Sequence, residues 1–570
     1  MIVISFTPGH CYFHCQDNLL RSYMHVNMKH IVAVLLVSLI LKDSLAQSHS
    51  SSIQRPRLVV GIVVDQMRWD YLYRFYDRYA EKGVFKRLLG QGFSCDNTMI
   101  PYIHTVTACG HASMYTGTVP AIHGITGNEW WDRKLNDYRY CTNDTSEKTV
   151  GSSTAAAGAM SPRNMLVTTV CDELKLATNF KSKVIGIALK DRGGILPAGH
   201  SADAAYWYDT RTGNWISSTY YMKELPAWVT SFNEKKWVDS FYARGWNTLY
   251  PVNTYIQSTE DNKPYENRMF GNGFPYTLSQ LIGKNYNPII ATPHGNTLTT
   301  EFAKTIIDNE KMGADEFTDF LTISYSSPDY VGHSFGPNSV EEEDVFLRLD
   351  KELGEFLDFL DTRIGKNQYL LFLSADHGVA NVPGFLTEHK IPAGNLKSLP
   401  LFDTLNMILK EKFGKEDLIA SVMNYQVVLN TKLIGSLNLD KREIKQWLVQ
   451  YLLRQPGIMD ALDLETIGQT TLTSKIKEMI VNSYYPKHSG DIQLLYSPQW
   501  IDGFEKSGTT HGVWNPYDAH IPLLWYGWNI KPGKSSHEVY ITDIAPTLAA
   551  VLKIQMPSGC TGKVIDEIAK

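Results

Sequence analysis

The chain has 570 residues, of which 43% are hydrophobic and 20% are charged, the composition of an ordinary globular protein. This length is too great for one simple core, and it predicts either several domains or one large domain with insertions. The formal net charge of −5 gives no electrostatic basis for binding nucleic acid or an anionic membrane.

The N-terminal region carries a targeting pattern. A positively charged start at Met28-Lys-His is followed by an apolar run over 31–41 and by small residues at 44–46. This is the pattern of a secretory signal peptide, and the apolar run is too short to span a bilayer comfortably. We therefore expect a signal peptide over 28–46, preceded by an upstream extension, 1–27, that is not native. The mature chain would act in the periplasm or be secreted.

The mature chain, 47–570, contains several short apolar runs rich in β-branched residues, as expected of strands buried on both faces. The predicted strands are 58–64, 183–189, 320–325 and 369–374, with late strands at 491–496 and 521–526. Polar or amphipathic helices are predicted between them, to about Leu89, over 339–360 and over 543–552. Strands that alternate with helices indicate an α/β fold with a mostly parallel central sheet flanked by helices.

Two long segments interrupt this alternation. Residues 198–300 are aromatic and irregular, and 385–490 contain helices near 403–412, 441–454 and 472–481. We expect one catalytic domain over 47–570, with both segments as insertions that pack over its active site and recognise the substrate. Five cysteines remain in the mature chain, and their odd number allows at most two disulfides and leaves the pairing open: Cys95, Cys109, Cys141, Cys171 and Cys560.

A stretch of hydroxyl and small residues, 105–117, precedes a segment that can form a helix. The first N–H groups of a helix are unpaired and lie at the positive end of its dipole, so this place suits an anionic group. Thr107 could act there as a nucleophile, provided that a neighbouring group lowers the pKa of its hydroxyl. The alternative is a helix cap rich in Ser and Thr.

Carboxylates and imidazoles follow the predicted strands at the point where each ends. In parallel sheets ligands gather at these carboxyl ends, so the side chains should meet there. Taken singly, each Asp could cap a helix and each His could be a core residue. Together they favour two Zn²⁺ ions, because mixed Asp and His ligands suit zinc and a metal pair can stabilise both oxygens of an in-line displacement. The candidate ligands are Asp65, Asp329, His333, Asp376, His377 and His511.

Three further residues could bind a phosphoryl group. Asn128 can donate to an oxyanion, and Lys190 and Arg192 stand two apart after a predicted strand. If that segment is extended, both cations point to the same side. Arg would bind phosphate bidentately and Lys as a point charge. The alternative is a solvated strand end.

With these residues in place, the chain resembles the alkaline phosphatase superfamily, and most closely the PafA-type (phosphate-irrepressible) bacterial alkaline phosphatases. The matching stretches occur in consistent order over about 58–570, essentially the whole mature chain. They are Val60–Asp70, Thr105–His111, His123–Asn128, Lys190–Arg192, Asp329–His333, Ser374–Gly378, Thr509–Gly512 and Asp543–Thr547.

The resemblance implies an enzyme with two Zn²⁺ and a covalent phosphothreonine intermediate on Thr107. One Zn²⁺ would be held by Asp329, His333 and His511. The other would be held by Asp65, Asp376, His377 and the Thr107 oxygen. Asn128, Lys190 and Arg192 would contact the phosphate, with the Lys/Arg pair in place of a third, Mg²⁺-centred site. The implied substrates are small phosphate monoesters, and we expect a monomer.

Several other functions compete with this one. A phosphodiesterase or nucleotide pyrophosphatase of the same superfamily would share the metals and the threonine, but a diester has one ionisable oxygen fewer for Lys190 and Arg192. A sulfatase is disfavoured because no Cys/Ser-x-Pro-x-Arg signature is present. A phosphoglycerate mutase is disfavoured by the signal peptide and by threonine where that family uses serine. A non-catalytic phosphate-binding protein is disfavoured because all six ligand positions are filled.

Overall fold

The computed structural model describes residues 53–503 and 507–569. It divides into two units, Met1–Gln54 and Arg55–Lys570, and the fold described below is that of the second unit. The predicted signal peptide and upstream extension lie outside the described residues. A search of the described residues finds no helix long and apolar enough to cross a membrane.

A ten-stranded sheet forms the centre of the fold, and the four predicted buried strands are neighbours within it. The inner strands β11, β1, β10, β7 and β8 are parallel, whereas β19 and β9 flank them in antiparallel orientation. The order is β20 (Gly533–Ser535), β2 (Phe93–Cys95), β19 (Leu523–Gly527), β11 (Tyr369–Ser374), β1 (Leu58–Val64), β10 (Asp319–Tyr325), β7 (Val184–Ala188), β8 (Ala204–Asp209), β9 (Asn214–Ser218) and β6 (Thr149–Val150).

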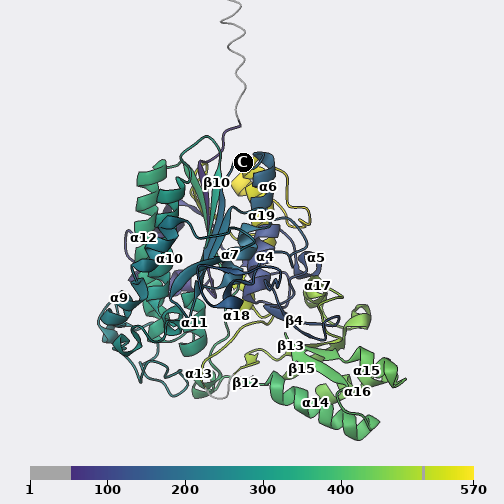
Figure 1. Cartoon of the computed structure of the whole chain (residues 1–570). Helices are drawn as coiled ribbons and strands as arrows, with labels where there is room; N and C mark the ends of the chain where they lie inside the picture. The colour runs from purple at the N-terminus through teal and green to yellow at the C-terminus, as the bar shows by residue number, and fades with distance from the viewer. Residues whose placement is uncertain (1–52, 504–506, 570) are drawn as a thin grey trace, which may run out of the picture. The chain divides into compact units, whose positions relative to one another are not determined.

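Helices cover both faces of the sheet, which explains why every residue of β1 is buried. On one side of β10 in Figure 1 lie α10 (Pro293–Glu310) and α12 (Val340–Leu360). On the other side lie α4 (Thr107–Thr116), α6 (Val170–Ala177), α7 (Asp191–Ala198) and α19 (Ile544–Leu552). The predicted α/β architecture is therefore confirmed.

The helix predicted from β1 to about Leu89 is broken into three pieces. These are α2 (Tyr71–Arg74), a 3₁₀ turn (Tyr76–Arg78) and α3 (Val84–Gln91). Asp350 of α12 accepts hydrogen bonds from the backbone N–H of Ala80 at 2.8 Å and of Phe85 at 2.9 Å. This distant carboxylate holds the chain in a turn between the helices, which local periodicity does not reveal.

The region expected as a first insertion, 198–300, is only partly one. Residues 204–218 form β8 and β9 and extend the main sheet, so the irregular part begins after Ser218. Both strands are aromatic and buried, so they lack the alternation of polar and apolar residues from which they could have been predicted.

The five cysteines of the expected mature chain are all free thiols in the part of the chain that the structure describes.

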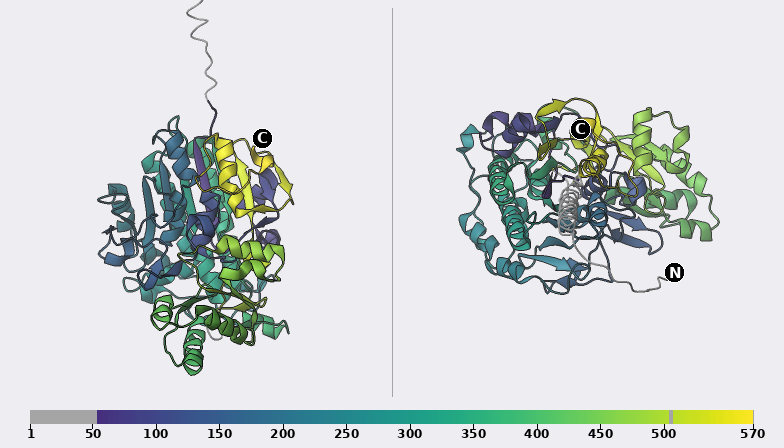
Figure 2. Two further views of the ribbon diagram at one scale, coloured as in Figure 1. Left: turned by 90° about the vertical axis from the view of Figure 1, so that its right-hand side faces the viewer. Right: turned by 90° about the horizontal axis from the view of Figure 1, so that it is seen from above.

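The second insertion folds as a subdomain with its own hydrophobic core. A four-stranded sheet in the order β13 (Ile419–Met423), β14 (Gln426–Leu429), β16 (Ile492–Tyr496) and β15 (Ile458–Asp463) packs with α14 (Ser398–Phe413) and α16 (Lys441–Leu452). The late strand predicted at 491–496 thus belongs to this sheet. Figure 2 shows these green segments grouped together in both views.

Candidate active site

The carboxyl ends of the parallel strands bring the predicted ligands together. Asp65 follows β1 directly, and Asp376 and His377 follow β11. Asp329 lies in the first turn of α11 (Ser327–Phe335), the helix that follows β10, with His333 one turn later. All these carboxylates are buried, which is the placement expected at the ligand edge of an open α/β sheet.

Thr107 is the first residue of α4, whose N-cap is Val106. Its Oγ1 lies 3.4 Å from His377 Nε2 and 3.4 Å from Lys190 Nζ. The hydroxyl is therefore at the positive end of a helix dipole and beside an ammonium group, both of which favour an alkoxide. The helix thus begins within the stretch 105–117 and not after it, as the sequence had suggested.

The three imidazoles share one arrangement. In each, Nδ1 contacts a backbone carbonyl: Thr509 O at 2.8 Å for His333, Gly378 O at 3.0 Å for His377 and Thr105 O at 2.7 Å for His511. A carbonyl only accepts, so Nδ1 carries the proton and the Nε2 lone pair is free to bind a metal. Burial lowers the pKa of His377 to about 3 and also lowers the pKa of His511, which keeps both rings neutral.

The Nε2 atoms point at the carboxylates. His333 Nε2 and His511 Nε2 lie 3.2 Å and 3.4 Å from Asp329 Oδ1. His377 Nε2 lies 3.4 Å from Asp376 Oδ2 and 3.5 Å from Asp65 Oδ1. The buried oxygens Asp65 Oδ1 and Asp376 Oδ2 have no hydrogen-bond partner among the described residues. These unpartnered oxygens and oriented nitrogens form a donor set that fits divalent zinc.

The ligand residues form two groups of three, and within each group the ligand atoms lie within 4.8 Å of one another. One is Asp65, Asp376 and His377, and the other is Asp329, His377 and His511. His377 thus stands between the two groups, and its ring stacks on that of His511 at 3.6 Å between centroids. His333 reaches the second group through its contact with Asp329.

The spacing of Lys190 and Arg192 suggested one extended segment, but the two residues do not lie on one. Lys190 is the N-cap of α7, and Arg192 lies in the first turn of that helix. Lys190 Nζ reaches inward to Asp65 Oδ2 at 2.7 Å and also pairs with Asp329. Burial opposes this charge, but Asp329 and Asp65 raise the pKa of Lys190 above its ordinary value. The carboxylates of the site are therefore arranged around positive charge.

Arg192 is held by a tyrosine. Its Nη1 donates to the Tyr140 hydroxyl at 2.9 Å, and that hydroxyl donates to Asp191 Oδ1 at 2.8 Å. Tyr140 ends β5 (Asp137–Tyr140), which pairs with β4 (Glu129–Asp132) directly after Asn128. Asn128 Oδ1 accepts from Ala108 N–H at 2.9 Å in the first turn of α4, which leaves the amide NH₂ as a donor.

Sequence reasoning missed two residues that contact the ligands. Gln66 donates from Nε2 to Asp329 Oδ1 at 2.8 Å and from its backbone N–H to Asp376 Oδ1 at 3.1 Å. His111 Nδ1 lies 3.2 Å from Asp376 Oδ2 and 2.8 Å from Thr107 O. The position of His111, four residues after Thr107 on the same helix, was a signal that could have identified it.

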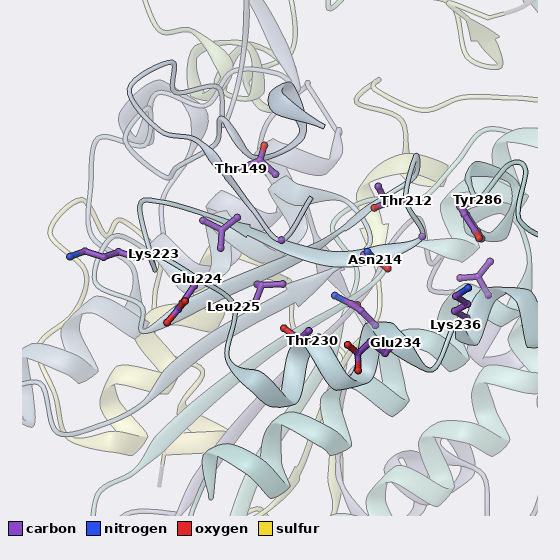
Figure 3. A pocket seen from close by; sticks show the side chains of 15 residues that line it. Thr149, Thr212, Asn214, Lys223, Glu224, Leu225, Thr230, Glu234, Lys236 and Tyr286 are labelled. Atoms are coloured by element: carbon purple, nitrogen blue, oxygen red, sulfur yellow. The ribbon is translucent and has the colours of Figure 1, made fainter. Parts of the chain in front are cut away.

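A separate pocket of about 720 Å³ lies against β9 and the helices α8 (Ala227–Glu234) and α9 (Trp237–Arg244) (Figure 3). Its lining includes both acidic and basic side chains, Glu224 and Glu234 with Lys223 and Lys236. None of its lining residues is a predicted site residue. Mixed charge gives this pocket no preference for a phosphate dianion.

Comparison with known proteins covers nearly the whole described chain. The family model for type I phosphodiesterase / nucleotide pyrophosphatase matches residues 59–516. Alkaline phosphatase PhoV of Synechococcus elongatus is 51% identical over 522 residues, which are 91% of this chain and 94% of that protein. A Myroides odoratus protein named a calcium-transporting ATPase is 50% identical over 531 residues, 92% of this chain and 96% of that protein.

The fold matches a solved structure equally well. The crystal structure of wild-type alkaline phosphatase PafA has a TM-score of 0.89 and 48% identity, and the match covers 91% of this chain and 100% of that one. A PafA variant with four substitutions, Thr to Ser, Asn to Ala, Lys to Ala and Arg to Ala, matches with a TM-score of 0.88 and 47% identity over 90% of this chain and 99% of that one.

Proposed function

Because this chain belongs to the type I phosphodiesterase / nucleotide pyrophosphatase family, and within it to the PafA-type alkaline phosphatases, we propose that it hydrolyses phosphate monoesters with Thr107 as nucleophile. The observation that carries this proposal is the position of Thr107 Oγ1 at a helix N-terminus, 3.4 Å from both His377 Nε2 and Lys190 Nζ. A hydroxyl in that place has a proposed zinc ligand and positive charge beside it, and both favour its ionised form.

The substituted PafA variant supports the choice of four residues. The Thr, Asn, Lys and Arg changed there are separated by 21, 62 and 2 residues. Thr107, Asn128, Lys190 and Arg192 have the same separations in this chain. These four are therefore proposed as the catalytic and phosphate-binding residues.

We assign two Zn²⁺ ions to the oriented ligands. Asp329, His333 and His511 would hold one, and Asp65, Asp376, His377 and the Thr107 oxygen would hold the other. When bound, zinc would lower the pKa of the Thr107 hydroxyl and offset charge on the phosphoryl oxygens. Lys190 and Arg192 supply further positive charge, so no third Mg²⁺ is proposed.

The residues of the chain then perform the following steps. Asn128 and Arg192 orient the phosphoryl group, while Lys190 offsets its charge. Thr107 Oγ1, whose proton is lost to solvent, forms a bond to phosphorus as the bond to the leaving alkoxide breaks, and the alkoxide takes up a proton from water. Water attacks the phosphothreonine in the second step, which releases inorganic phosphate and regenerates the Thr107 hydroxyl. Positioning and charge provide nearly all the catalysis in such transfers.

The two cations Lys190 and Arg192 favour a monoester over a diester. A monoester presents more anionic non-bridging oxygen for Lys190 and Arg192, whereas a diester adds a second ester group that needs room. The name of the Myroides odoratus relative describes hydrolysis of ATP, whose terminal phosphoryl group has the same non-bridging oxygens as a monoester. A phosphodiesterase or nucleotide pyrophosphatase remains the second candidate, because the matched family model bears that description.

We also propose that the mature enzyme is a monomer and acts in the periplasm or after secretion. The support for export is the targeting pattern at 28–46 in the sequence.

The experiment compares p-nitrophenyl phosphate, bis-p-nitrophenyl phosphate and ATP on the same purified protein, before and after metal removal with EDTA. We expect the monoester to have the highest kcat/KM, and we expect added Zn²⁺ to restore the activity that EDTA removes. A diester hydrolysed faster than the monoester would favour the second candidate. Undiminished activity after complete metal removal would contradict the two-zinc assignment.

A further inference from the structure

The second insertion reaches the active site through one turn. Strands β13 and β14 pair with Met423 opposite Gln426, so Asn424 and Tyr425 form a two-residue hairpin turn. Both have left-handed backbone, with φ of 51° and 56°. This is the geometry of a type I′ turn, which favours glycine at its second central position.

Tyrosine in left-handed backbone is unfavourable, so surrounding contacts must hold it. The Tyr425 carbonyl accepts from Leu494 N–H at 2.8 Å and from Gln493 Nε2 at 3.0 Å. Its ring lies edge-on to Tyr496 at 4.8 Å between centroids. Strained backbone that the surroundings enforce in this way is concentrated at functional sites.

Each residue of the turn contacts a different loop of the active site. Asn424 Nδ2 donates to Glu129 O at 2.7 Å, next to Asn128. Tyr425 Oη donates to the carbonyl of His511 at 3.2 Å. The first contact is on the loop that carries Asn128, the proposed hydrogen-bond donor to phosphate. The second is on the loop that carries His511, a proposed zinc ligand.

Glycines make these close contacts possible. A Cβ on Gly127 would meet Asn424 Nδ2 at 2.5 Å, and a Cβ on Gly512 would meet the Tyr425 ring at 2.9 Å. These glycines directly precede Asn128 and directly follow His511. Both active-site loops are thus shaped to receive the tip of the hairpin.

We propose that Asn424 and Tyr425 are positioning residues of the catalytic centre, which fix the loop of Asn128 and the loop of His511 relative to Thr107. The inference rests on the proposed function. It assigns the second insertion a role in catalysis, in addition to the substrate recognition expected from the sequence. Neither residue is proposed to touch the reacting atoms.

The primary test is Asn424→Gly, because glycine keeps the left-handed turn and removes only the amide. We expect kcat/KM for p-nitrophenyl phosphate to fall about tenfold, in line with the loss of one positioning hydrogen bond. Inhibition by inorganic phosphate should weaken by a similar factor, while Tm stays within about 2 °C of the wild type. The matched control is Asn438→Gly, since Asn438 is an exposed left-handed residue (φ 51°) of the same insertion.

A double-mutant cycle separates positioning from general damage. In an Asn128→Ala background, Asn424→Gly should have almost no further effect if it acts through Asn128. Tyr425→Phe tests the other contact, and we expect this variant to retain less zinc than the wild type after dialysis against a weak chelator.

The positioning role of Asn424 would be refuted by an unchanged kcat/KM in Asn424→Gly or by additive losses in the double-mutant cycle. The role of Tyr425 would be refuted by an unchanged zinc content in Tyr425→Phe. An inactive wild-type protein would instead refute the proposed function, so the two failures are distinguishable.

Discussion

The sharpest prediction concerns the double variant Lys190→Ala with Arg192→Ala. Lys190 Nζ is buried and lies 3.4 Å from Thr107 Oγ1, while Arg192 Nη1 is held by Tyr140 and its buried Nε has no partner among the described residues. As proposed phosphate-binding residues, both cations would make a charge-assisted hydrogen bond to a bound phosphoryl group. Such bonds contribute about 1.5–3 kcal/mol each, so the pair should contribute about 3–6 kcal/mol to a monoester.

Converted to rates, this range predicts a fall in kcat/KM for p-nitrophenyl phosphate of about 10²- to 10⁴-fold. A diester offers less anionic oxygen to the two cations, so its kcat/KM should fall by a factor at least about ten times smaller. The assay is steady-state kinetics of both substrates at one pH with saturating zinc. Equal losses on both substrates would refute the reasoning that these cations select a monoester.

Lys190 needs a control because it also pairs with Asp65 and Asp329, two proposed zinc ligands. Its removal alone changes the charge balance of the ligands, so the zinc content of each variant must be measured. Arg192→Ala alone avoids this complication, since the hydrogen-bond partner of Arg192 is Tyr140 and not a ligand. Tyr140→Phe should reproduce part of the Arg192→Ala defect, because it removes only the hydroxyl that orients the guanidinium.

Two further predictions test the nucleophile and the acidic core. Thr107→Ala should lower kcat by about 10³-fold or more and should give no phosphorylated protein after acid quenching, whereas Thr107→Ser should retain activity. Mass spectrometry of the quenched protein checks both variants, and a phosphorylated Thr107→Ala protein would contradict the assignment. Glu341, in the first turn of α12, is buried, and burial together with Glu266 raises the pKa of Glu341 to about 8, with Asp261 and Tyr276 also facing it. The folded state thus holds a proton that the unfolded state loses above about pH 4.3, so this group lowers the free energy of unfolding as pH rises towards about 8. Glu341→Gln should therefore stabilise the protein at about pH 9 relative to about pH 5, by up to a few kcal/mol in denaturant unfolding, and a stability difference independent of pH would contradict this.

The central strands and the carboxyl-end ligands could be predicted from sequence for one physical reason. Strands buried on both faces read as continuous apolar runs, and the polar residue that ends such a run lies at the ligand edge of the sheet. Asp65 and Asp376 could be placed in this way. β8 and β9 could not, because their buried aromatic residues lack both the alternation of a half-exposed strand and the β-branched character of the central ones.

The orientation of Lys190 and Arg192 required tertiary information. Spacing alone predicted two side chains on one face of an extended segment. The chain instead enters α7 at Asp191, and Lys190 is drawn inward by carboxylates 125 and 139 residues away. Likewise, the contact between Asn424 and Glu129 spans 295 residues and leaves no local pattern.

The proposed nucleophile and the loop of His511 behave as one structural unit. The Thr105 carbonyl accepts from His511 Nδ1 at 2.7 Å, and the Thr105 hydroxyl donates to Val513 O at 2.8 Å. Thr105 lies two residues before Thr107, so the segment that leads into α4 also fixes a proposed zinc ligand. This explains why Thr105 belongs to the same motif although it is not the nucleophile. A displacement of the 511–513 loop would be transmitted directly to Thr107, and the contact of Tyr425 with His511 lies where it would oppose such a displacement.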